Sequence, residues 1–122
     1  IVQELRQAGI GVVILQNIPE PDPQTTSPSL LRRLLPNSVP TQFNAGTALE
    51  DRVAVAAAEE RIASVNPGTV VVDPVASLCP DGPCLLTSGQ SPVYLDAVHL
   101  TREGSLMLTK DLVSALKRAA RP

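Results

Sequence analysis

Two short apolar runs constrain the fold of this chain more than any other feature. They are Ile10–Leu15 (IGVVIL) and Thr69–Val72 (TVVV), and both are rich in β-branched residues. Continuous runs of this kind are typical of strands that are buried on both faces of a parallel sheet. The connection between them is long enough to hold a helix, and a strand–helix–strand order favours parallel pairing. The sequence therefore predicts an α/β fold.

Three helical segments accompany these runs. Residues 1–8 look helical, and Gly9 stands where helices commonly end. The Thr47-x-x-Glu50 pattern is a capping-box signature, and the helix it opens should run to about Ser64. Thr101 can cap a last helix over about 102–119. The apolar positions expected to face the sheet from the middle helix are Leu49, Val53, Ala56 and Ala57, with Val55, Ala58, Ile62 and Val65 beside them.

The segment 19–46 is rich in proline and predicts mostly irregular structure. A short helix over Ser29–Leu35 is indicated by Ser27 as cap, Pro28 at the first helical position and Pro36 as the stop. It would carry Arg32 and Arg33. These side chains could contact an anionic substrate or could simply be solvated surface charge.

Composition narrows the class of protein. The 122 residues have a formal net charge of -2 and are 43% hydrophobic, which is the profile of a globular domain. There is no basic stripe and almost no aromatic surface for stacking bases, so we expect no nucleic-acid partner. No apolar run approaches the roughly 20 residues of a transmembrane helix. Because the chain starts within a predicted helix, we expect it to be a segment of a longer protein.

The two cysteines, Cys79 and Cys84, flank Pro80-Asp81-Gly82-Pro83. Turn chemistry of this kind brings the two flanks together. A zinc site would need further ligands that a single histidine cannot supply. The residues favour a disulfide, which would indicate an oxidising compartment outside the cytoplasm, and two buried free thiols are the alternative.

The only histidine, His99, follows Asp96 by three residues on a predicted loop. A carboxylate at that spacing can bond one ring nitrogen and leave the other free to take a proton from a nucleophile. The alternative is a surface histidine with an incidental aspartate beside it. Asn17 is a weaker site candidate, because it follows the first strand at the edge where α/β sheets bind ligands. Ser88-Gly89-Gln90-Ser91, which precedes the segment with Asp96 and His99, predicts the turn of a hairpin.

The ordered set of motifs resembles a known family. Asp-x-x-His-Leu-Thr-x-x-Gly, from Asp96 to Gly104 and preceded by Tyr94, resembles the last block of SGNH (GDSL-like) hydrolases. Val71-x-Asp73-Pro74, the Leu78 to Cys84 loop and Pro19-Glu20 resemble the subgroup fused to integral-membrane acyltransferases of acyltransferase family 3, which O-acetylate glycans of the cell envelope.

The resemblance implies a three-layer, flavodoxin-like sheet of which residues 1–122 are the C-terminal portion. It implies that His99 is the general base of a Ser-His-Asp triad and that Asp96 orients it. The Gly-Asp-Ser block that carries the family's nucleophile has no counterpart here, so no nucleophile is assigned and the isolated segment should be inactive. The implied partners are an acyl donor, a glycan acceptor, the missing N-terminal part of the domain and a membrane acyltransferase region. The implied location is the extracytoplasmic side of a membrane. We expect neither a metal nor an organic cofactor.

Two other functions remain open at this point. A secreted SGNH esterase would cleave the same bond with water in place of the sugar. A non-catalytic α/β interaction module would keep Asp96 and His99 for structure alone, and no serine would then approach His99 in the full protein.

Overall fold

The computed structural model describes residues 1–23 and 40–121 of the chain. The short helix predicted over Ser29–Leu35, with Arg32 and Arg33, lies outside the described residues. The described elements are α1 (Val2–Gln7), β1 (Val12–Leu15), β2 (Gln42–Phe43), α4 (Gly46–Val65), β3 (Thr69–Val72), α5 (Val75–Leu78), β4 (Cys84–Leu85), β5 (Thr87–Ser88), β6 (Ser91–Pro92), α6 (Arg102–Met107) and α7 (Thr109–Ala119).

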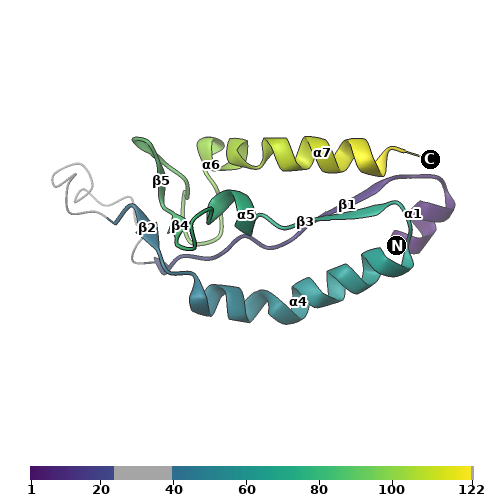
Figure 1. Cartoon of the computed structure of the whole chain (residues 1–122), viewed down its shortest axis with the longest axis horizontal. Helices are drawn as coiled ribbons and strands as arrows, with labels where there is room; N and C mark the ends of the chain where they lie inside the picture. The colour runs from purple at the N-terminus through teal and green to yellow at the C-terminus, as the bar shows by residue number, and fades with distance from the viewer. Residues whose placement is uncertain (24–39, 122) are drawn as a thin grey trace.

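The centre of the fold is the parallel pair of β1 and β3, as the sequence predicts. Val12 lies opposite Thr69, and Leu15 lies opposite Val72. The backbone of Figure 1 shows α4 along one side of this pair and α7 along the other. Both helices contact β3, and α7 also contacts β1. The α/β prediction is confirmed, with three layers formed by helix, strands and helix.

The prediction that both strands are buried on both faces is only partly correct. Val72 is buried and Leu15 is 43% exposed, while the other residues of β1 and β3 are half-buried. A two-stranded sheet has no inner strand, so each strand has one edge that no described strand covers.

The start of α4 differs from the prediction. The helix begins at Gly46, one residue before Thr47, so the expected capping box does not form. The side chain of Asn44 takes its place, because its Oδ1 accepts a hydrogen bond from the Gly46 N–H at 3.0 Å. An asparagine oxygen is as good an acceptor at a helix start as the threonine hydroxyl would be.

The expected apolar face of α4 is also wrong in part. Leu49 and Ala56 are half-buried, but Val53 is 62% exposed. Arg52 lies on the inner side instead, because its guanidinium reaches Asp73 at the end of β3. The helix is thereby rotated away from the orientation that would bury the most apolar surface.

The last predicted helix is divided in two. Leu108 separates α6 from α7, and its N–H bonds the Ser105 carbonyl three residues earlier. This is a tighter turn than that of an α-helix. Leu108 is only 3% exposed, so the tightened turn places its side chain in the core.

The core lies at the end of the molecule where β1 and β3 terminate. A disulfide joins Cys79 to Cys84, as predicted, and no free cysteine remains. The short pair β2–β4 and the hairpin β5–β6 surround it, and the hairpin confirms the predicted turn. The sequence did not indicate β2, β4 or α5. The buried cluster consists of Ala45, Leu78, Cys79, Cys84, Leu86, Val93, Tyr94 and Leu108.

Candidate active site

The segment from Tyr94 to Leu100 is a short loop whose base is closed by backbone hydrogen bonds. Tyr94 and Leu100 form an antiparallel bridge, and the Leu95 N–H donates to the His99 carbonyl at 2.8 Å. Immediately outside this bridge, the Thr101 N–H donates to the Val93 carbonyl at 2.9 Å. Backbone hydrogen bonds alone therefore fix both ends of the loop.

Asp96 organises the interior of this loop. Its Oδ1 accepts hydrogen bonds from the backbone N–H groups of Val98 and His99, each at 2.8 Å. The ring of His99 turns toward the same carboxylate, with Nδ1 at 2.8 Å from Oδ2 and 3.0 Å from Oδ1. The Val98 N–H, and then the His99 ring, lower the pKa of Asp96. The structure thus brings together the two residues that the sequence singled out.

The His99 ring is accessible while Asp96 holds it. Its side chain is 68% exposed, and among the described residues its only side-chain partner is Asp96, through Nδ1. Nε2 is therefore the nitrogen that remains for a reacting group. A ring held in this way can accept a proton at Nε2 while the carboxylate stabilises the charge that forms.

An open depression of about 420 Å³ includes His99. Its lining also contains Asn17 and Glu20, from the chain that follows β1, and Ser105 of α6. The Ser105 hydroxyl donates to the Thr101 carbonyl at 2.9 Å, as an ordinary helical serine does. Asn17 was a weak candidate in the sequence, and the structure places it in the lining of the same depression as His99. The proximity of Glu20 and Ser105 was not anticipated.

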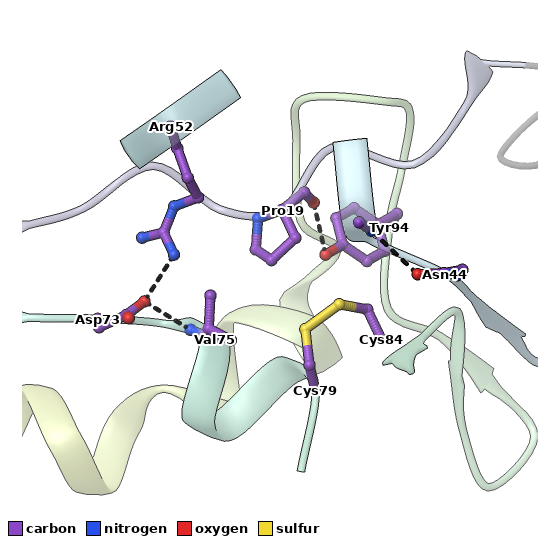
Figure 2. Close-up of a disulfide and its surroundings, with 9 residues drawn as sticks. Pro19, Asn44, Arg52, Asp73, Val75, Cys79, Cys84 and Tyr94 are labelled. Carbon is purple, nitrogen blue, oxygen red and sulfur yellow. Dashed lines mark hydrogen bonds and ion pairs between the residues drawn. A yellow bond between two sulfur atoms is a disulfide. The ribbon is translucent and has the colours of Figure 1, made fainter. Parts of the chain in front are cut away.

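Tyr94 fixes the relation between this loop and the chain after β1. Its ring is 3% exposed and meets Phe43 edge to face at 5.8 Å. Its hydroxyl donates to the Pro19 carbonyl at 2.9 Å (Figure 2). Burial raises the pKa of Tyr94, so the phenol remains a hydrogen-bond donor. Pro19 and Glu20 are thereby held next to the loop that carries Asp96.

A polar network lies at the ends of β1 and β3 and was missed in the sequence. The Arg52 guanidinium contacts Asp73 at 3.0 Å and donates to the side chain of Gln16 at 3.2 Å. Asp73 also accepts from the Val75 N–H at 3.0 Å, which fixes the start of α5 (Figure 2). An Asp-Pro pair at a strand end was visible in the sequence, but nothing local indicated its arginine partner.

The start of α6 anchors the loop from the other side. The Thr101 hydroxyl accepts from the Gly104 N–H at 3.0 Å, which confirms the predicted cap. Gly104 packs directly on the backbone of Val93, so that any side chain at this position would collide with the Val93 carbonyl. The glycine of the Leu-Thr-x-x-Gly motif is therefore explained by close approach of α6 to the loop base.

Within residues 1–23 and 40–121, no group of three or more His, Cys, Asp or Glu side chains could hold a metal ion. No helix of that same part of the chain is long and apolar enough to cross a membrane.

Comparison with known proteins gave one match. A family model described as "SGNH domain (fused to AT3 domains)" matches residues 2–114, which is most of the chain. The comparison with curated proteins gave no match, and neither did the comparison with solved structures.

Proposed function

The chain belongs to the family of SGNH domains fused to AT3 domains, and from that premise we propose that it is part of a serine-dependent O-acyltransferase. The reaction moves an acyl group, of which acetyl is the simplest, onto a hydroxyl of a cell-envelope glycan. His99 acts as the general base, and Asp96 orients it. The observation that carries this proposal is the contact of His99 Nδ1 with both oxygens of Asp96. Nε2 takes no part in that contact, and His99 lines an open depression.

The nucleophile in this proposal is a serine outside the described residues. No described serine hydroxyl contacts His99, and Ser105, which lines the same depression, donates to a backbone carbonyl instead. Residues 1–122 would then be the C-terminal portion of the domain. The incoming serine would lose its proton to Nε2 and attack the acyl carbonyl, and the donor's leaving group would depart with that proton from His99, which leaves an acyl-serine. The glycan hydroxyl would then lose its proton to Nε2 and attack the acyl-serine, and the serine would leave and regain a proton from His99.

The family description supports an associated membrane acyltransferase region in the parent protein. The disulfide supports an oxidising location, on the extracytoplasmic side of the membrane. In this arrangement the membrane region supplies the acyl group and the SGNH domain passes it to the glycan.

The test is acetyl transfer by the full protein, with p-nitrophenyl acetate as donor and a glycan oligomer as acceptor. His99→Ala should lower kcat by at least about a thousandfold, because triad members act as a unit. Asp96→Asn should be severe but less complete, since a base remains. Glu60→Gln, an exposed position on α4 away from the loop, is the matched control. Wild-type turnover by His99→Ala would rule out the triad.

The same assay separates the alternatives. Release of free acetate without transfer to any glycan would indicate an esterase. The isolated chain of residues 1–122 should give no His99-dependent burst, because it lacks the nucleophile. A burst that His99→Ala abolishes would show that the serine lies within these residues.

A further inference from the structure

A second, larger depression of about 630 Å³ adjoins the one that contains His99. The two share Asn17, Ile18 and Glu20 in their linings. The larger one continues to the first turns of α4 and includes Ala97 of the Asp96–His99 loop. Together they form one surface channel, here called the α4 groove, which starts at His99, passes Glu20 and ends beside Asp51 and Arg52.

Among the described lining residues of the α4 groove, the acidic side chains are not balanced by a free cation. Glu20 and Asp51 are exposed carboxylates on its walls. Arg52 is the only cation among its described lining residues, and its guanidinium is already engaged by Asp73 and Gln16. Its positive charge is therefore offset by Asp73, and the described lining residues of the groove carry net negative charge.

The groove also carries groups suited to a polar, uncharged ligand. Asn17 can donate and accept, the carboxylates can accept from sugar hydroxyls, and Ile18 and Phe43 add apolar surface.

We propose that the α4 groove binds the acceptor glycan, and that Glu20 makes it select neutral or amino sugars over acidic ones. This inference rests on the proposed acyl transfer at His99. Glu20 lies where the two depressions meet, so an acceptor that reaches His99 passes its carboxylate. An acidic sugar would meet like charge there, whereas hydroxyl or ammonium groups would be attracted.

The experiment uses the full protein, p-nitrophenyl acetate and three acceptors of equal length. They are the trimers of N-acetylglucosamine (neutral), glucosamine (cationic) and galacturonic acid (anionic). The wild type should acetylate the first two in preference to the third. Glu20→Gln should raise the anionic-to-neutral ratio of kcat/KM by about fivefold, and Glu20→Lys by more, with both effects shrinking as salt rises. Glu60→Gln should leave the ratio unchanged.

A binding arm separates this inference from the proposed function. Titration calorimetry of the same trimers with His99→Ala protein reports acceptor binding without turnover, and adding Glu20→Lys should reverse the order of affinities. An unchanged order of acceptors in both assays would overturn the inference, even if His99-dependent cleavage of the donor persists. Loss of the His99 dependence alone would instead overturn the acyl transfer itself.

Discussion

Replacing Gly104 by alanine should destabilise the domain, although alanine favours a helix by about 1 kcal/mol over glycine. A Cβ at this position would overlap the Val93 carbonyl oxygen and would lie 3.0 Å from the Val93 carbonyl carbon and 3.1 Å from its Cγ1. Overpacking of this kind costs roughly 1–3 kcal/mol. The Val93 carbonyl also accepts from the Thr101 N–H, and weakening that bond costs about 1 kcal/mol more. The net loss should be about 2 kcal/mol.

Thermal and urea unfolding of the full protein measure this loss as a lower unfolding midpoint of the domain that contains α6. Gly46→Ala is the matched control, because its Cβ would meet only Asn44 Oδ1 at an ordinary 3.4 Å. That variant should stay within about 0.5 kcal/mol of the wild type. Because the Val93 carbonyl closes the base of the Asp96–His99 loop, Gly104→Ala should also lower acetyl transfer. Equal stability of the two variants would refute the reasoning.

Three further predictions concern the surroundings of the loop. Tyr94→Phe should lower the free energy of unfolding by about 1–3 kcal/mol, because it leaves the buried Pro19 carbonyl without its donor. The edge contact with Phe43 should persist. No loss of stability would mean that water replaces the hydroxyl. The lowered pKa of Asp96 means that its contribution to loop stability is present above its ordinary value of 3.8 and is lost as pH falls through the lower, folded value. Protection of the Val98 and His99 amides, measured against the intrinsic exchange rate at each pH, should therefore fall below pH 3.8, and this fall should be absent in Asp96→Asn. Replacing both Cys79 and Cys84 by serine should cost about 2 kcal/mol, since the closed loop is short, and the wild type should show no titratable thiol.

The parallel pair was predictable because its information is local. Val12–Leu15 and Thr69–Val72 are apolar at successive positions, and the helix between them dictates parallel pairing. The runs do not by themselves state how many neighbours each strand has; among the described residues β1 and β3 pair only with each other, so most of their residues are half-buried. The same limit applies to β2 and β4, two-residue strands that exist only because tertiary contacts bring Phe43 opposite Cys84.

The orientation of α4 was mispredicted for a physical reason. Apolar periodicity favoured Val53 on the inner face, but the structure turns Arg52 inward to meet Asp73 and Gln16. A partly buried charge that finds an opposite charge and a hydrogen bond can outweigh the burial of one valine. Asp73, the partner of Arg52, follows β3 and not α4, so no residue spacing within the helix could have predicted the contact.

In the candidate site, too, the local contacts were predictable from the sequence and the tertiary ones were not. The Asp96–His99 contact was foreseen because the two residues are three apart on one loop, and the backbone bonds of that loop are themselves local. That Glu20 and Ser105 line the same depression as His99 was not foreseen, because it depends on how β1 and α6 pack. Asn17 was found through a general property of sheet edges, which identifies a region and not a contact.

The exposure of the Asp96–His99 pair decides what holds its geometry. An ion pair between side chains that are 68% and 52% exposed is screened by solvent and cannot by itself fix two rotamers. Backbone hydrogen bonds fix the geometry that the side-chain pair alone cannot. Asp96 is held by the N–H groups of Val98 and His99, and the loop is attached to Val93 and Tyr94, which are 0% and 3% exposed. The carboxylate is therefore oriented whether or not the imidazole carries a proton. The general-base role proposed for His99 requires a partner that is in place while the ring is still neutral, and the backbone of this loop holds the Asp96 carboxylate in that position.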